Sequence, residues 1–476
     1  MYLTEKRSKL VVTIGPSSDN YDVLKKLVLA GATTIRANFS HGDYAEQGNK
    51  FKIANEVSKD LNVPISLMLD TKGPEIRVGK MKDGIQTIER DSLVRILTMP
   101  EDYKNLEGTS EFFTVEYRMD KDLKVGDQVL VDDGKLTTTV EKVEPGVVYV
   151  RAANQHKVKS NKRINLPGVA FSLPFLSEKD KADIKFGVEQ KVNYIAASFV
   201  NSKENVKELR DLLDSLGGEK IKIISKIESQ LGCNNLTEIV EASDGIMVAR
   251  GDLGLEIPYY EVPYWEKKMI RASREKGKPV IVATQMLDSM ENNPHPTRAE
   301  VTDVYFATEL GADSTMLSGE SANGKYPVEA VKVMSTINMR AERDFYDKLY
   351  YKHQLEEILE IAPKDHRTKI AAEIVNKTMS GEYKFVVVLS DTGKLLERVA
   401  MLRPNAPIIG LVKDVELLGS YGVTSSIFIS LHSPKLYSIV KNDYSLANTA
   451  LIPYGVKPGD KYLVAHNEKV VELIAK

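Results

Sequence analysis

The sequence predicts an α/β protein whose main domain is a (β/α)8 barrel, and two observations lead to this. First, eight short apolar runs alternate with longer segments of helical pattern, which is typical of βαβ units and a parallel sheet. Second, polar residues directly follow six of these runs, where a barrel of this class builds its active site. The eight strands are expected at residues 11–14, 33–37, 65–69, 194–197, 221–227, 245–249, 279–283 and 314–317.

One helix is marked at both ends. Thr297 and Glu300 have the spacing of a capping box, in which each side chain accepts a hydrogen bond from the other residue's backbone N–H. Apolar residues then recur at helical spacing, and Gly311 follows. Glycine commonly ends a helix because it adopts the left-handed conformation without a steric penalty.

An all-β insert is predicted to interrupt the barrel. Asp133-Gly134 separates two strand-like runs at 128–132 and 137–140, and a third run follows at 147–150. We expect a small β-barrel that forms a lid over the barrel mouth, since such lids exclude water from reacting groups. The predicted domains are 1–77 and 162–343 for the barrel, 78–161 for the lid, and 344–476 for a C-terminal α/β domain with strands at 385–389, 408–411 and 426–429.

Composition excludes several classes of protein. Lys plus Arg number 65 and Asp plus Glu 67, which gives a net charge of −2, so nothing global favours nucleic acid or an anionic membrane as a partner. The single cysteine, Cys233, allows no internal disulfide and favours a reducing compartment. No apolar run approaches the ~18 residues of a membrane span. We therefore expect a cytoplasmic protein.

The clearest candidates for chemistry are Lys226, Glu228 and Asp252. Lys226 and Glu228 are two apart on one predicted strand, so both side chains face the same way, and Asp252 follows the next strand. Carboxylates from adjacent strands suit Mg²⁺, which keeps several water or substrate oxygens as ligands. The alternative is a buried ion pair. Zinc is not indicated, because the seven histidines show no ligand spacing and one cysteine cannot build a thiolate site.

Other polar residues gather at the same predicted edge. Arg36 and Lys72 are candidates for recognising phosphate or carboxylate, or else are solvated loop cations. Thr284 could relay a proton, although a threonine at a strand end is ordinarily structural. Four hard oxygen donors could bind a monovalent cation or simply cap loops: Asn38, Ser40, Asp70 and Thr71.

Such charges favour phosphoryl transfer, in which catalysis is mostly positioning and charge stabilisation. The sequence has no Gly-x-x-x-x-Gly-Lys-Ser/Thr loop and no protein-kinase catalytic loop. A phosphotransferase built on this chain is therefore of neither the P-loop nor the protein-kinase type.

From near Lys9 to about Ala330, and more loosely beyond, the chain resembles the pyruvate kinase family. Eight ordered motifs carry the resemblance: Thr13-Ile14-Gly15-Pro16-Ser17-Ser18, Asn38-Phe39-Ser40-His41-Gly42, Leu69-Asp70-Thr71-Lys72-Gly73-Pro74-Glu75-Ile76-Arg77, Asn165-Leu166-Pro167-Gly168, Ser225-Lys226-Ile227-Glu228, Met247-Val248-Ala249-Arg250-Gly251-Asp252-Leu253-Gly254, Ala283-Thr284-Gln285-Met286-Leu287 and Leu317-Ser318-Gly319-Glu320.

The resemblance implies a reaction in glycolysis, in which phosphoenolpyruvate and ADP give pyruvate and ATP. It also implies that Glu228 and Asp252 bind Mg²⁺ (or Mn²⁺), that Lys226 stabilises the phosphoryl group in flight, and that Arg36 binds the substrate phosphate. Gly251, Asp252 and Thr284 are implied to contact the substrate, with Thr284 near the path of the proton to the enolate.

Two further sets of residues are transferred in the same way. The implied K⁺ ligands are Asn38, Ser40, Asp70 and Thr71. The implied nucleotide contacts are Asn38, His41, Arg77 and Lys162. A homotetramer is implied by the resemblance alone.

Three positions bear on how far the resemblance reaches. Glu75 predicts K⁺ dependence, because family members with Lys at this position replace the mobile cation by a fixed ammonium. The family usually has Gly where Arg163 stands. The loop from Ser390 to Lys394 resembles a phosphate-binding effector loop but continues differently, so an ordinary helix cap is at least as good an interpretation, and activation by a sugar bisphosphate is not expected.

Two other functions fit parts of the pattern. A barrel lyase or aldolase acting on phosphoenolpyruvate or a 2-oxo acid would share the Mg²⁺ carboxylates but would need no ADP site, and the lid and Arg77 argue against it. A non-catalytic regulatory protein would have lost its charged residues, whereas Arg36, Lys226, Glu228 and Asp252 are all present.

Overall fold

The computed structural model of the 476-residue chain describes residues 4–169, 172–347 and 349–476. Its centre is a closed barrel of eight parallel strands in the order β1-β17-β16-β15-β14-β13-β3-β2. Each strand overlaps one of the eight predicted runs, so the predicted fold class is confirmed. The strands are β1 (Lys9–Thr13), β2 (Thr34–Asn38), β3 (Ser66–Asp70), β13 (Tyr194–Ala197), β14 (Lys222–Ile227), β15 (Gly245–Ala249), β16 (Val280–Ala283) and β17 (Ser314–Leu317).

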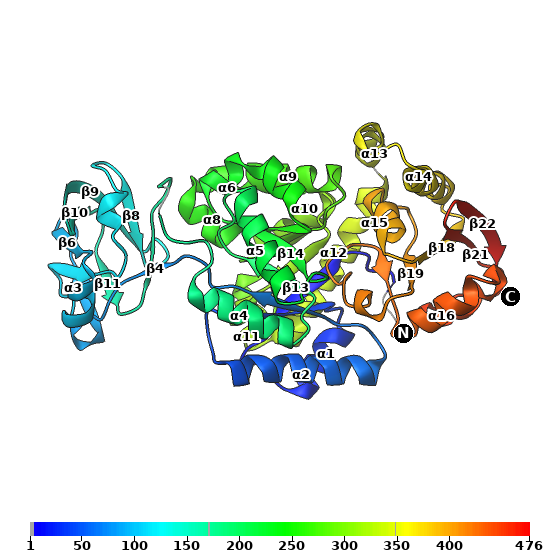
Figure 1. Cartoon of the computed structure of the whole chain (residues 1–476), viewed down its shortest axis with the longest axis horizontal. Coiled ribbons are helices and arrows are strands. Elements are labelled where there is room, and N and C mark those ends of the chain that lie inside the picture. Colours follow the sequence, from blue (N-terminus) through cyan, green and yellow to red (C-terminus); the bar gives the residue numbers. More distant parts are fainter. Residues whose placement is uncertain (1–3, 170–171, 348) are drawn as a thin grey trace.

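Helices surround the barrel and bury its outer face (Figure 1). The predicted capping box is confirmed at α10, where the Thr297 hydroxyl and the Glu300 carboxylate each bond the other residue's backbone N–H. The longer helices of this domain are α1 (Tyr21–Leu29), α2 (Tyr44–Leu61), α4 (Glu178–Glu189), α5 (Lys203–Ser215), α9 (Val262–Glu275), α10 (Arg298–Glu309) and α12 (Pro327–Asp347); the shorter ones are α6 (Gln230–Asn234), α7 (Leu236–Ala242), α8 (Arg250–Glu256) and α11 (Gly319–Ala322).

The insert is all-β apart from short helical turns and has a hydrophobic core of its own. Seven strands form one sheet in the order β4-β12-β8-β9-β10-β6-β7, and an antiparallel bridge from Val78 to Val115 joins its two edges. The strands are β4 (Ile76–Arg77), β5 (Ile85–Ile88), β6 (Leu93–Leu97), β7 (Phe112–Thr114), β8 (Gln128–Val131), β9 (Leu136–Glu144), β10 (Val147–Ala152), β11 (His156–Lys159) and β12 (Arg163–Asn165), and the one α-helix is α3 (Pro100–Asn105).

Three predicted boundaries need correction. The sheet of the insert begins at β4 and ends at β12, outside the predicted limits of 78 and 161, because these two strands pair with each other where the chain enters and leaves the lid. The predicted boundary at 343 falls inside α12, which extends to Asp347. The sequence pattern indicated approximately where the lid begins and ends. It did not indicate that β4 and β12, at the junction of the lid with the barrel, pair with each other.

The C-terminal domain is a five-stranded sheet, in the order β20-β19-β18-β21-β22, with helices on its faces. Three predicted strands are present as β18 (Tyr383–Ser390), β19 (Ile408–Val412) and β20 (Ile427–Phe428). The hairpin of β21 (Lys461–His466) and β22 (Lys469–Ile474) was not predicted from the sequence. The helices are α13 (Leu349–Ile361), α14 (His366–Thr378), α15 (Lys394–Met401), α16 (Ser433–Val440) and α17 (Ala447–Leu451).

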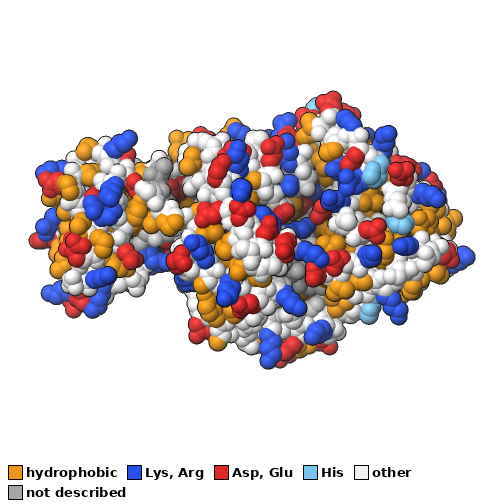
Figure 2. Space-filling model, in the orientation of Figure 1, with side chains coloured by type: hydrophobic (Ala, Val, Ile, Leu, Met, Phe, Trp, Pro, Cys, Tyr) orange, Lys and Arg blue, Asp and Glu red, His pale blue; other side chains and the backbone are white. Residues whose placement is uncertain are grey.

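The lid and the C-terminal domain lie on opposite sides of the barrel (Figure 1). In the space-filling view the lid joins the barrel through a narrower neck, and side chains of both charges are scattered over the visible face (Figure 2). None of the helices in the described ranges is both long and apolar enough to cross a membrane.

Candidate active site

A cavity of about 290 Å³ lies at the carboxyl ends of the barrel strands and is closed on one side by the lid. It brings together most of the site residues predicted from the sequence. Those that line it are Arg36, Asn38, Ser40, His41, Asp70, Thr71, Lys72, Glu75, Arg77, Lys162, Lys226, Glu228 and Asp252, together with Asp132, Asp133, Arg163, Ser198 and Phe199.

Lys226 is the centre of a buried polar network. It follows the inward-facing Ile224 on β14, so the two-residue period of a strand carries Lys226 and Glu228 to the top of the barrel interior. The Lys226 ammonium lies 3.0 Å from carboxylate oxygens of both Asp70 and Glu228 and donates to the Ser198 hydroxyl at 2.7 Å. Burial opposes the charged amine, but the two carboxylates outweigh it and raise the pKa of Lys226.

Arg36 completes this network from β2. Its Nε donates to Asp70 at 2.6 Å and its Nη1 donates to Thr13 at 2.7 Å. Burial disfavours the Asp70 carboxylate, but Arg36 and Lys226 more than offset that effect and lower its pKa. Asp70 is therefore an anion held between two cations.

Glu228 is almost fully buried. One carboxylate oxygen faces Lys226, and the other accepts a hydrogen bond from the backbone N–H of Phe199 at 2.8 Å. Burial raises the pKa of Glu228 to about 7 despite the neighbouring ammonium. A second cation beside this carboxylate would favour its ionised form.

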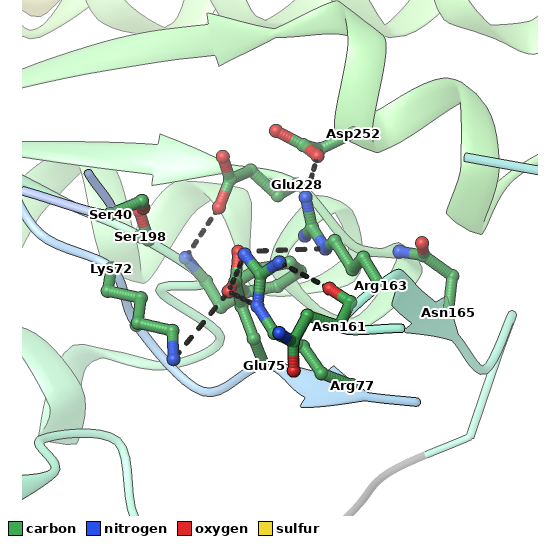
Figure 3. A network of polar contacts seen from close by, with 12 residues as sticks. Ser40, Lys72, Glu75, Arg77, Asn161, Arg163, Asn165, Ser198, Glu228 and Asp252 are labelled. Carbon is green, nitrogen blue, oxygen red and sulfur yellow. Dashed lines mark hydrogen bonds and ion pairs between the residues drawn. The ribbon is translucent and has the colours of Figure 1, made fainter. Parts of the chain in front are cut away.

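Asp252 follows β15 and lies in the first turn of α8. The helix begins directly after the strand, at Arg250. The Asp252 carboxylate forms an ion pair with Arg163 of the lid (Figure 3). Its side chain is about one-quarter exposed, so it remains accessible from the cavity.

Glu228 and Asp252 together suit a hard divalent cation. Within the described ranges no three His, Cys, Asp or Glu side chains group into a metal site. Mg²⁺ commonly binds one or two carboxylates and completes its octahedron with water and substrate oxygens. The donor set therefore fits Mg²⁺ or Mn²⁺ held jointly with a substrate.

The four predicted K⁺ ligands lie on neighbouring strand ends, and all four line the cavity. The Asn38 side chain accepts a hydrogen bond from the Ser40 backbone N–H at 3.0 Å. The Thr71 hydroxyl oxygen accepts one from the Ser198 backbone N–H at 3.1 Å. These contacts leave further lone pairs on each oxygen, as a shared cation would require.

Gly251 lies in the first turn of α8, just after β15, and Thr284 follows the adjacent strand β16. Neither residue is part of the cavity lining. The Gly251 backbone N–H donates to the Thr284 hydroxyl at 2.7 Å, and that hydroxyl donates to the Ala283 carbonyl oxygen at 2.6 Å. Thr284 has a φ of +69°. A β-branched residue in this conformation is strained, and such strain tends to persist where it fixes a functional group.

The predicted nucleotide contacts face the cavity from the barrel and the lid. Arg77 bonds the Glu75 carboxylate at 2.7 Å and the Asn161 carbonyl oxygen at 2.8 Å (Figure 3). Lys162 pairs with Asp132 at 2.8 Å. Glu75 is largely buried, and the cations beside it are Arg77, Lys72 and Arg163.

Sequence reasoning missed three members of the site. Ser198 links Lys226 to the backbone of Thr71, and it follows β13, one of the two barrel strands that are not among the six with predicted polar ends. Asp132 binds Lys162 and His156 from the lid hairpin. Arg163 had been treated only as a departure from the family pattern, and nothing local in the sequence indicated its contact with Asp252.

Comparisons with known proteins agree with this architecture. The family model "Pyruvate kinase, barrel domain" matches residues 5–331. A pyruvate kinase from Mycoplasma pneumoniae is 42% identical, over 94% of each chain, and one from Mycoplasma genitalium is 40% identical, over 98% of this chain and 99% of its own. The crystal structure of a pyruvate kinase from Cryptosporidium parvum superposes with a TM-score of 0.92 at 32% identity, covering 99% of this chain and 97% of the other. With a barrel model over most of its length and relatives that align from end to end, the chain belongs to the pyruvate kinase family of phosphotransferases.

Proposed function

We propose that the cavity at the barrel mouth transfers the phosphoryl group of phosphoenolpyruvate to ADP, giving pyruvate and ATP. The observation that carries the proposal is the Lys226 network. A buried ammonium held between Asp70 and Glu228 faces a cavity with a further carboxylate and several cations. Fixed charges of this kind stabilise the charge that moves in phosphoryl transfer.

Glu228 and Asp252 are the proposed ligands of Mg²⁺ or Mn²⁺, which when bound would neutralise negative charge on the substrate oxygens. Arg36 would bind the substrate phosphate, since its guanidinium is fixed by Asp70 and Thr13. Lys226 stays protonated because its pKa is raised by the two carboxylates that outweigh its burial, so it would stabilise the phosphoryl group during transfer.

Gly251 and Thr284 are proposed to act at the carboxylate end of the substrate. The hydrogen bond between them fixes the Thr284 hydroxyl, and this hydroxyl would hold or pass the proton that the enolate takes up. Neither residue lines the cavity. The carboxylate end of the substrate would therefore have to extend beyond the part of the cavity that holds its phosphate.

Asn38, His41, Arg77 and Lys162 are the proposed contacts of ADP. Arg77 and Lys162 stand where the lid joins the barrel, so lid closure would bring their charges toward the nucleotide phosphates and exclude water. Asn38, Ser40, Asp70 and Thr71 are proposed to bind K⁺, and Glu75 adds negative charge beside them.

A coupled assay tests the proposal. ATP is expected only when phosphoenolpyruvate, ADP and a divalent cation are all present, and the rate is expected to fall strongly when Na⁺ replaces K⁺. Consumption of phosphoenolpyruvate without ADP would instead favour a lyase or aldolase. Equal rates with K⁺, with Na⁺ and without either cation would remove the K⁺ site from the proposal.

A further inference from the structure

Arg163 projects from the lid into the proposed metal site. Its Nη1 is paired with Asp252 and its Nε lies 3.9 Å from a Glu75 oxygen (Figure 3). Its guanidinium stands 5.0 Å from the centre of the Phe199 ring. The side chain is only 16% exposed. It is therefore a fixed part of the cavity wall rather than a surface cation.

A second contact holds strand β12 of the lid against helix α8 of the barrel. Asn165 follows two residues later on β12, on the same face, and its amide donates to Glu256 at 3.0 Å. Asp252 and Glu256 are four residues apart on α8, so they share one face of that helix. One strand face of the lid thus docks on one helix face of the barrel, and the ion pair and the hydrogen bond lie side by side.

The charges around Arg163 resemble those that a divalent cation would meet. The carboxylates of Asp252, Glu228 and Glu75 surround its guanidinium and attract its positive charge. Two of these carboxylates, Asp252 and Glu228, are the proposed cation ligands. The guanidinium donates to Oδ1 of Asp252, and a coordinated cation would have to share or take over that carboxylate.

We propose that Arg163 competes with the divalent cation for Asp252, so that the cation must displace a guanidinium before the site is complete. The inference rests on the proposed metal site at Glu228 and Asp252. By linkage, whatever free energy the Arg163 contact contributes to the cation-free protein is subtracted from cation binding. Removing the guanidinium would therefore tighten binding.

The test is a Mn²⁺ titration of the whole protein without substrates, with free Mn²⁺ measured by electron paramagnetic resonance. Arg163→Gln is expected to bind Mn²⁺ at least tenfold more tightly than the parent protein, and Arg163→Lys to fall between them because it keeps the charge but loses the fork of donors. Arg151→Gln is the matched control. Arg151 is also on a lid strand and pairs with a carboxylate, Glu141, at 2.8 Å, but it lies outside the cavity lining, so its loss should leave Mn²⁺ affinity unchanged.

Glu228→Gln separates the two proposals. If Glu228→Gln weakens Mn²⁺ binding but Arg163→Gln binds like the parent protein, the metal site stands and the competition is overturned. If Glu228→Gln has no effect, the metal site itself is wrong and the inference about Arg163 falls with it. An affinity gain that Arg163→Lys reproduces in full would also contradict the competition, because it would not depend on charge.

Discussion

Lys226 is the residue on which the proposed chemistry depends most. Its three partners, Asp70, Glu228 and Ser198, fix the ammonium in position before any substrate arrives. A donor that is already oriented needs no reorganisation during the reaction, which is why such groups contribute strongly to catalysis.

We predict that Lys226→Met lowers the rate of ATP formation by ~10²–10³ or more, the loss typical of removing a charge stabiliser. Proton exchange between the enolate and ketone forms of pyruvate should suffer less, because that step needs no phosphoryl transfer. Lys222→Met is the matched control: it lies at the other end of β14 and pairs with Glu397, so the rate should stay near that of the parent protein. An equal collapse of proton exchange would identify Lys226 as a proton-transfer residue.

Lys9 is a buried cation far from the active site. It donates to the Ile427 carbonyl oxygen at 2.5 Å and stands 4.0 Å from the centre of the Phe428 ring. Burial, with a smaller effect of the nearby Lys6, lowers the pKa of Lys9 to about 7. The unfolded chain keeps the ordinary, higher pKa, so between pH 7 and pH 10 it binds more protons than the folded protein does.

Stability should therefore rise with pH through this window, since the folded state no longer carries a buried charge. We predict that Lys9→Met is more stable than the parent protein near pH 7 and that this advantage shrinks by on the order of 3 kcal/mol by pH 10, at about 1.4 kcal/mol per pKa unit. Denaturant unfolding at several pH values measures it. The exposed Lys52→Met should show no such pH dependence, and a parallel offset at every pH would contradict the assignment.

At the scale of elements, local sequence patterns predicted those strands and helices whose signals lie within a few residues of one another. The barrel strands were found because each is short and apolar and six of them are followed by polar residues, and α10 was found because its capping box lies within four residues. The β21–β22 hairpin was missed. Its turn at Asn467, with a φ of +53°, carries no glycine, and β22 alternates only weakly between buried and exposed positions.

In the candidate site, too, the sequence predicted what depends on nearby residues and missed a contact between two domains. Lys226 and Glu228 could be placed together because they share a strand, and the eight motifs carried most of the other residues. The pairing of Arg163 with Asp252 joins residues 89 positions apart through the docking of two domains. No periodicity or spacing encodes such a contact, which depends on how the lid sits on the barrel.

The capping box of α10 offers a test of one element. We predict that Thr297→Ala lowers the free energy of unfolding by ~1 kcal/mol, because the Glu300 N–H loses its acceptor and the Glu300 carboxylate loses the hydroxyl donor at 2.9 Å. Thr297→Ser keeps the hydroxyl and should retain most of the stability. Thr302→Ala, an exposed change within the same helix, is the control, and a loss as large as that of Thr297→Ala would show that the cap is not the cause.

At the scale of the whole molecule, the C-terminal domain covers the end of the barrel opposite the active site. Val423 packs among the inward-facing side chains of the barrel strands. Asp313 lies beside it, at the start of β17. Its carboxylate is paired with Arg403 at 2.9 Å and accepts hydrogen bonds from the backbone N–H groups of Ser425 and Val280. One buried carboxylate thus ties β16 to two segments of the C-terminal domain.

Removing Arg403 should weaken the contact between the barrel and the C-terminal domain more than removing one partner of an exposed ion pair at the same boundary. We predict that Arg403→Ala destabilises the protein by ~3–5 kcal/mol, the typical effect of leaving a buried partner charge uncompensated. In calorimetric scans at one fixed rate, the C-terminal domain should unfold in a separate, earlier transition. Lys220→Ala removes an exposed pair with Asp414 across the same boundary and should cost less than about 1 kcal/mol. Equal losses in the two variants would mean that the domains are held together by apolar packing around Val423, and that the Asp313–Arg403 pair contributes little.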